Sequence, residues 1–207
     1  MTKPAFVLLL LLSCSALLPT ETRADSVTID FENLIDSTLV GSAYASSGVI
    51  FTNAIIATAG TSLNEFDFPP HSGSNVVFDF GGPITLTFLT PVSSFSGFFT
   101  YASPLTLNGL GTSNQLLVTA SSLFSTNFVS SGNQSNELIQ LNFPGGIDSV
   151  TIIGDPGGLS FTLDDASFTT VAAAPVPEPS SLLLLFTGIA FALIIGRRRV
   201  MASFTGN

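Results

Sequence analysis

All five Lys and Arg residues of this chain lie near its two ends. Lys3 and Arg23 stand at the beginning, residues 197–199 are arginines, and no Lys or Arg falls between Asp25 and Pro179. An average globular sequence is about one-quarter charged, with both signs interspersed. Because the cations are confined to the ends, we interpret the ends as targeting signals and the acidic middle as the part that folds into a domain.

Residues 1–24 have the pattern of a secretory signal peptide. Lys3 supplies the positive charge, and the apolar run 5–12 is too short to span a bilayer. Ala24 is a small residue at a suitable cleavage position, so the mature protein is predicted to begin at Asp25. Cys14 leaves an alternative open, because the Leu-Leu-Ser sequence before it resembles a lipoprotein box. With cleavage after Ala24, the mature domain contains no cysteine and therefore no disulfide.

The last part of the chain has the order of segments expected of a membrane anchor. Residues 172–179 form an Ala- and Pro-rich linker, which is expected to be extended. Residues 180–196 carry no charge and would reach about 25 Å as a helix, close to the hydrocarbon thickness of about 30 Å. The basic tail, residues 197–207, should stay in the cytoplasm. The sequence therefore predicts one transmembrane helix that leaves the domain outside.

A Pro-Glu-Pro motif, the Leu-rich segment and the Arg cluster follow one another in a characteristic order. The motif residues are Val176, Pro177, Glu178, Pro179, Arg197, Arg198 and Arg199. Together they closely resemble the PEP-CTERM sorting signal of Gram-negative bacteria, although residues 200–207 extend further past the arginines than is usual. The resemblance implies export through the secretion translocon, an inner-membrane stage and processing by an exosortase. It also implies delivery to the cell surface or extracellular matrix, with exopolysaccharide as a candidate partner.

Residues 25–171 are predicted to form one all-β domain. Short segments alternate between apolar and polar residues with the two-residue period of half-buried strands, and none has the period of an amphipathic helix. Val76, Phe78 and Phe80 are expected to share one face, and the residues expected to face inward include Ile84, Leu86, Phe88, Ile139, Leu141 and Phe143. Gly- and Pro-rich turn signals separate several of these segments. Many short strands favour a two-sheet antiparallel β-sandwich of jelly-roll type, with the Phe residues as its core.

The domain also resembles the ectodomains found before PEP-CTERM signals and lectin-like or carbohydrate-binding β-sandwiches. The residues that carry this resemblance are 29–34 near its start, Tyr44 with 48–53, and 163–168 at its end. It implies a glycan-binding module as an alternative function. The chain has no Trp, so Tyr44 and Tyr101 are the candidate residues for stacking on a sugar.

The acidic residues of the domain have no basic partners. Residues 25–171 contain twelve Asp and Glu and no Lys or Arg, so no such salt bridge can form there. The Asp164-Asp165 pair interrupts the alternation of the last strand and predicts a bulge. In carbohydrate-binding sandwiches the first and last strands often share a structural calcium ion. By that analogy the candidate calcium ligands are Glu32 and Asp165, with Asp30 and Asp164 in reserve. Alternatively, these residues keep a strand soluble and form a turn.

The sequence offers little support for catalysis or nucleic-acid binding. His71 is the only histidine, so a catalytic triad would have one candidate base, and no zinc or phosphate motif is present. Nucleic acid is excluded for a domain without Lys or Arg. Glu65, Asp67 and Glu137 leave a secreted glycoside hydrolase open as an alternative. We therefore expect a non-catalytic surface or biofilm-matrix protein, and treat one Thr-x-Thr step as insufficient for ice binding.

Overall fold

The computed structural model of the chain describes residues 24–172, together with residues 185, 188 and 189. Most of the predicted signal peptide, linker, transmembrane helix and basic tail lies outside these residues. Among the described residues, no helix is long and apolar enough to cross a membrane.

Nine antiparallel strands make up the domain, with two short 3-10 turns between them. The strands are β1 (Ser26–Ile29), β2 (Val49–Thr52), β3 (Ala54–Thr58), β4 (Asn75–Asp79), β5 (Ile84–Tyr101), β6 (Thr106–Leu110), β7 (Leu116–Ser121), β8 (Glu137–Ile153) and β9 (Phe161–Thr170). The turns are η1 (Ala45–Ser47) and η2 (Val129–Ser131). The predicted all-β class is confirmed.

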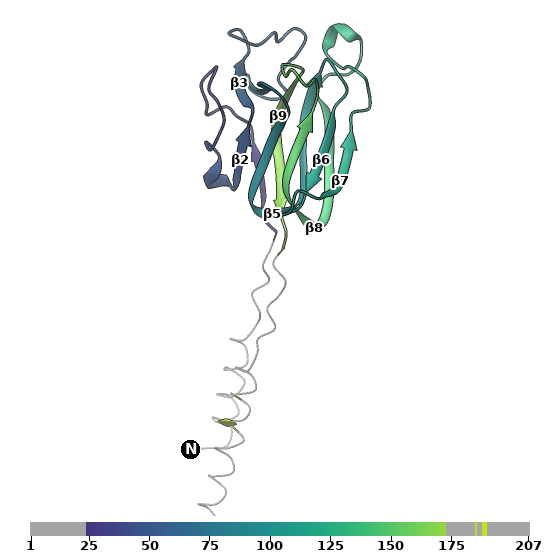
Figure 1. The fold of residues 1–207 in the computed structure, drawn as a ribbon. Coiled ribbons are helices and arrows are strands. Elements are labelled where there is room, and N and C mark those ends of the chain that lie inside the picture. Colours follow the sequence, from purple (N-terminus) through teal and green to yellow (C-terminus); the bar gives the residue numbers. More distant parts are fainter. Residues whose placement is uncertain (1–23, 173–184, 186–187, 190–207) are drawn as a thin grey trace, which may run out of the picture. The chain divides into compact units, whose positions relative to one another are not determined.

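Two long strands, β5 and β8, pair along most of their length and fold over at their middle (Figure 1). Residues 84–87 of β5 pair with 149–152 of β8, residues 94–99 pair with 137–142, and the register shifts between these stretches. Gly146 lies at the fold with a φ of 98°, and an added Cβ there would lie 3.0 Å from the Pro91 Cβ. Glycine is therefore required where the two strands turn over together.

Each half of the folded β5–β8 pair extends into a different sheet. The first sheet has the order β2-β5-β8-β6-β7, and the second has the order β3-β4-β9-β5-β8 with β1 also paired to β9. Side chains from both sheets meet in one hydrophobic core. The predicted two-sheet, jelly-roll-like sandwich is thereby confirmed, and its hydrogen bonding is continuous because β5 and β8 belong to both sheets.

The core matches most of the predicted strand faces. Ile84, Leu86 and Phe88 are buried, as are Ile139 and Leu141. The bulge predicted at Asp164-Asp165, in β9, is also present. Ser96 pairs with Ser167 but Phe98 pairs with Asp164, so three steps along β9 oppose two along β5. Asp165, inside this bulge, has a φ of 46°.

Val76 and Phe78 of β4 share one face, as predicted, and that face lies away from the main core. Val77 and Asp79 point toward the main core, whereas Val76 and Phe78 pack in a second cluster on the outer face, and Phe80 is half-exposed beyond the strand. Asp79 tolerates burial because its carboxylate accepts the N–H of Ser160 at 2.7 Å, the N–H of Phe161 at 3.1 Å and the Ser160 hydroxyl at 2.9 Å. A buried carboxylate with three donors satisfies its hydrogen-bonding needs.

Residues 24–172 form a compact unit by themselves. The residues of the main core all fall between Val27 and Phe168. The two ends of the unit are tied together, since β1 pairs with the second half of β9 and the Asp25 N–H donates to the Thr170 hydroxyl at 2.9 Å. The domain therefore carries everything that its own folding requires.

Candidate functional site

The long β3–β4 loop, residues 59–74, lies over the outer face of the second sheet. Leu63 and Phe68 of this loop pack with Val76 and Phe78 of β4 in the second hydrophobic cluster. The Phe68 ring also stacks on Phe128, with ring centroids 6.1 Å apart. The loop thereby covers the part of β4 that a free sheet face would expose to water.

The carboxylates of Asp36 and Asp67 fix the β3–β4 loop at two places. Asp36 accepts the Thr58 N–H and the Ser62 hydroxyl, and Asp67 accepts the N–H and the hydroxyl of Ser130. The hydrogen bond from the Ser62 hydroxyl is the main cause that lowers the pKa of Asp36 below its ordinary value. Those from Ser130 lower the pKa of Asp67. In the absence of Lys and Arg, backbone amides and serine hydroxyls stabilise these charges.

The β9 bulge clamps the end of the same loop. Asp164 Oδ2 accepts the backbone N–H of His71 at 2.8 Å and that of Ser72 at 2.9 Å. Asp165 Oδ2 lies 2.6 Å from His71 Nδ1, and its other oxygen accepts the Ser72 hydroxyl at 3.0 Å. The His71 ring stacks on Phe98, with ring centroids 3.4 Å apart. Burial raises the pKa of Asp164 to about 6, despite these donors.

Two of the four candidate calcium ligands, Asp164 and Asp165, belong to this clamp. Glu32 accepts the N–H groups of Ser74 and Asn75 at 2.9 and 2.7 Å, so it binds the same loop as Asp164 and Asp165. Asp30 is exposed and accepts only a weak hydrogen bond, from the Glu32 N–H at 3.2 Å. Within residues 24–172, no three His, Cys, Asp or Glu side chains gather as they would around a metal ion. Protein donors already occupy most of these oxygens, and calcium binding stays a prediction.

Tyr44 and Tyr101 do not form ligand platforms. Their exposed fractions are 7% and 0%, and their rings belong to the main core. The Tyr44 hydroxyl donates to the Asn33 side-chain oxygen, and the Tyr101 hydroxyl donates to the Glu137 carboxylate. Burial raises the pKa of both hydroxyls to about 12. The prediction that they stack on a sugar is wrong, because in a chain without Trp these rings fill the core and satisfy their hydroxyls internally.

The three carboxylates considered for glycoside hydrolysis have separate structural contacts. Asp67 binds Ser130, as described above. Glu137 accepts the Tyr101 hydroxyl and the Leu123 N–H. Among the described residues no hydrogen bond joins Glu65, Asp67 and Glu137 to one another. Asp67 and Glu137 therefore hold neighbouring loops in place through these hydrogen bonds.

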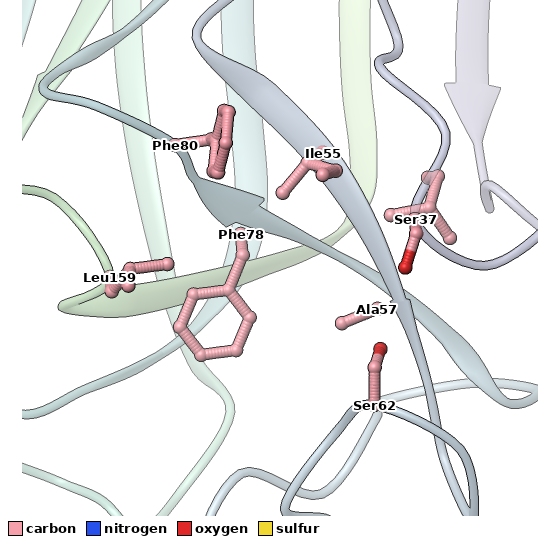
Figure 2. Close-up of a pocket in the computed structure, with 8 residues that line it drawn as sticks. Ser37, Ile55, Ala57, Ser62, Phe78, Phe80 and Leu159 are labelled. Carbon is pink, nitrogen blue, oxygen red and sulfur yellow. The ribbon is translucent and has the colours of Figure 1, made fainter.

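An apolar hollow lies on the outer face beside the covered part of β4. Its volume is about 350 Å³, and Figure 2 shows Phe78, Phe80, Ile55 and Leu159 around it. The remaining lining residues are Ser37, Ile56, Ala57 and Ser62. The two serines lie on the side away from Leu159 (Figure 2). Ile55 and Phe78 are direct cross-strand neighbours on β3 and β4, which explains why they share this face.

A second hollow shares Phe80 with the first as a lining residue. It has a volume of about 430 Å³ and is lined by Leu39, Gly41, Phe51, Thr52, Asn53, Ala54, Phe80 and Gly81. We refer to the two hollows together as the Phe80 groove. The only signal for it in the sequence was that Phe80 directly precedes the turn Gly81-Gly82-Pro83, where a strand ends. None of the described residues that line the two hollows is charged.

The C-terminal residues 175–199 match the family model described as the PEP-CTERM protein-sorting motif. The chain carries a PEP-CTERM sorting motif. Such a signal indicates an exported surface protein with a membrane-anchored stage, and it implies processing by an exosortase. The motif lies after the β-sandwich and describes its delivery. The activity of the sandwich has to be argued from the domain itself.

Among curated proteins none matches this chain. Several solved domains are similar to this chain. The K2 cleaved adhesin domain of Lys-gingipain is 15% identical, with a TM-score of 0.44, over 70% of this chain and 100% of that one. A DUF4465 family protein from Bacteroides caccae is 11% identical, with a TM-score of 0.44, over 70% and 99%. The CBM22-1 xylan-binding domain from Paenibacillus barcinonensis is 11% identical, with a TM-score of 0.40, over 74% and 99%. Similarities at this level assign no ligand to the chain.

Proposed function

We propose that this PEP-CTERM protein is a non-catalytic component of the cell surface or exopolysaccharide matrix of a Gram-negative bacterium. The observation that carries the proposal is the sorting motif at residues 175–199, which follows a self-contained β-sandwich. On this proposal the secretion translocon exports the chain, the C-terminal helix holds it in the inner membrane, and an exosortase then releases the domain to its final place.

The contacts of the polar side chains support a non-catalytic role. The single histidine has one ring nitrogen against Asp165 and its ring stacked on Phe98. The buried carboxylates of Asp79 and Asp164 each accept backbone N–H groups from distant segments. These are the residues with the most unusual surroundings, and each of them joins parts of the fold.

The arrangement of the domain suits display at a surface. The described chain enters and leaves at the end where β1 meets the C-terminal half of β9. Leu159 of the Phe80 groove precedes β9 at the opposite end of that strand. Ten strand residues span roughly 30 Å. Within the described residues, the groove and the point where the chain leaves the domain therefore lie at opposite ends of β9.

Intact mass and cell fractionation in the native host, with and without the exosortase, test this function. The expected product in the normal strain begins at Asp25 and ends within residues 177–181, outside the membrane fraction. The strain without the exosortase should retain residues 180–207 and keep the protein in the membrane. Membrane retention of the uncut chain in both strains would contradict the proposal, because the protein would then be a simple single-span anchor.

A second candidate function is a glycan-binding module, and the Phe80 groove favours it. Aromatic and aliphatic side chains form an open, uncharged hollow of the size that small ligands and polymer segments occupy. A glycan array probed with residues 25–172 separates this candidate from a purely structural matrix role. Saturable binding supports the module, whereas a blank array supports the structural role.

A further inference from the structure

The Phe80 groove presents large apolar side chains to water. Leu39, Phe80 and Leu159 have exposed fractions of 62%, 50% and 65%. Leu39 lies opposite Ile55, and Ile55 lies opposite Phe78, so an apolar row crosses three neighbouring segments of the sheet. Contiguous exposed apolar surface of this kind marks interaction sites in soluble domains.

The groove is held in a fixed shape. The Leu159 N–H donates to the Asp79 carbonyl at 2.8 Å, and the next two N–H groups donate to the Asp79 carboxylate. An added Cβ at Gly158 would lie 2.9 Å from the Gly81 nitrogen, so the backbone at Gly158 lies close against the backbone at Gly81. The side chains of Phe80 and Leu159 therefore project from two anchored segments.

Leu159 itself has a backbone conformation that leucine rarely adopts. Its φ is 57°, in the left-handed region that Gly and Asn favour, and its side chain is mostly exposed. A leucine here stabilises neither the local backbone nor the core. Strain of this kind combined with an exposed apolar side chain indicates that the side chain serves a contact outside the domain.

The charge of the domain restricts what that contact can be. Residues 25–171 contain twelve carboxylates and no Lys or Arg. A second copy of the domain or an anionic polymer would meet a potential of its own sign. None of the described lining residues is charged, and Thr52 and Asn53 place a hydroxyl and an amide group beside the apolar rings, while the Ser37 and Ser62 hydroxyls donate to the Asp36 carboxylate. An anionic ligand is thereby disfavoured, and the lining itself matches an uncharged ligand with apolar faces and hydroxyl-bearing edges.

We propose that the Phe80 groove binds a neutral polysaccharide chain. The Phe80 ring, which borders both hollows, packs against the C–H face of a sugar ring, and the two hollows take successive parts of the chain. Leu159 and Phe78 complete the apolar wall. This inference rests on the proposed function, since it names the ligand that would retain an exported domain in a polysaccharide matrix.

Polysaccharide affinity electrophoresis of residues 25–172 tests the proposal. The probes are neutral β-1,4-glucan, β-1,3-glucan, xylan and galactomannan, the neutral polysaccharide of the native host, and alginate as an anionic control at 0.15 M salt. The variants are Phe80→Ser and Leu159→Asn. Asn tolerates the left-handed conformation, so Leu159→Asn should remove the contact and leave the fold intact. Leu116→Ser is the matched control, because Leu116 is 60% exposed on β7, outside the groove.

At least one neutral polysaccharide should retard the wild-type domain. Phe80→Ser and Leu159→Asn should each weaken that binding at least tenfold, Leu116→Ser should change it less than twofold, and alginate should not retard any form. Thermal unfolding checks that all four proteins are folded. The absence of retardation by every neutral probe would overturn the proposal, as would retardation by alginate or an equal loss in the control.

Sedimentation velocity separates a second copy from a polysaccharide as the occupant. The wild-type domain should remain monomeric as its concentration rises. A dimer that Phe80→Ser abolishes would overturn the polysaccharide proposal. Export is followed separately in the native host with the full-length wild-type chain. A failure of its export or processing would count against the proposed function alone, because polysaccharide binding is measured on the purified domain.

Discussion

The fold-over end of the sandwich and the β3–β4 loop are stabilised by different interactions. At the fold-over end, Phe88 packs on Phe168 with ring centroids 5.1 Å apart, and Gly146 lies against Pro91. The β3–β4 loop is instead held by carboxylates that accept N–H and O–H groups. The first region depends on apolar burial, which pH does not change, and the second depends on ionised side chains.

The comparison shows how a domain without Lys or Arg manages an excess of carboxylates. Residues Glu32, Asp36, Asp67, Asp164 and Asp165 each accept hydrogen bonds from the loop or its immediate neighbours. Their oxygen atoms accept hydrogen bonds from loop backbone and hydroxyl groups that secondary structure does not satisfy. The sensitivity of the domain to pH should therefore concentrate in this loop.

The largest effect is expected at the fold-over end. Phe168→Ala removes a buried ring and should lower the free energy of unfolding by about 3–5 kcal/mol. The loss should be equal at pH 7 and pH 5, because no titrating group is removed. Urea unfolding at the two pH values measures it, with Leu116→Ala as the exposed control. If the loss of unfolding free energy differed between the two pH values, the fold-over end would also depend on pH, and the distinction between it and the β3–β4 loop would fail.

The next effect is expected at the β9 bulge. Asp164→Ala leaves the N–H groups of His71 and Ser72 without their acceptor, which should cost about 2–4 kcal/mol. Asp164→Asn keeps an acceptor oxygen and removes the charge, so it should cost less. Urea unfolding at pH 7 compares the three proteins. If Ala and Asn are equally well tolerated, the clamp does not hold the loop.

The same position has a defined pH signature. Burial raises the pKa of Asp164 to about 6, whereas an unfolded Asp has a pKa of about 3.9. Between these values the folded protein holds a proton that the unfolded chain has lost, so this group's contribution to stability falls as pH rises. The difference in unfolding free energy between wild type and Asp164→Asn should therefore shift in favour of Asn from pH 4 to pH 6. A flat difference would show that the carboxylate titrates normally.

Calcium should give a smaller effect if the predicted ligands bind it. For a dissociation constant of about 10⁻⁴–10⁻³ M, calcium at about 5 mM would add about 1–2 kcal/mol to the unfolding free energy. Thermal unfolding of chelated protein, with calcium then added back, measures this gain. The double variant Glu32→Gln/Asp165→Asn should not gain. Equal curves for wild type with and without calcium would remove the calcium hypothesis.

The smallest and most local effect is expected at Asp67, which joins the β3–β4 loop to Ser130. Hydrogen bonds from Ser130 lower the pKa of Asp67, so its contribution is present above the unfolded pKa and disappears as pH falls through the lower folded value. Asp67→Asn should raise amide hydrogen exchange in residues 59–74 and leave β5 and β8 unchanged. Faster exchange throughout the sandwich would show that the loop is part of the global core.

Local patterns predicted the sandwich, and long-range contacts explain what they missed. The alternation of residues 84–88 is visible within a few positions, and so is the interruption of the last strand's alternation at Asp164-Asp165, so strand facing and bulge were both predictable. The burial of Asp79 was not predictable, because its carboxylate is satisfied by residues 160 and 161. The Phe80 groove likewise depends on Leu159, about 80 positions away along the chain. The sorting motif was predictable because it is contiguous in sequence.

On the proposed function, the position of β9 has a mechanical consequence. β9 begins beside the Phe80 groove, ends at Thr170 next to the linker, and is paired with β5 on one side and with β4 and β1 on the other. Tension between a polymer in the groove and an attachment at the C-terminus would run along this strand. Its hydrogen bonds lie across that direction and would be loaded in shear, so many would have to break together before the domain yields.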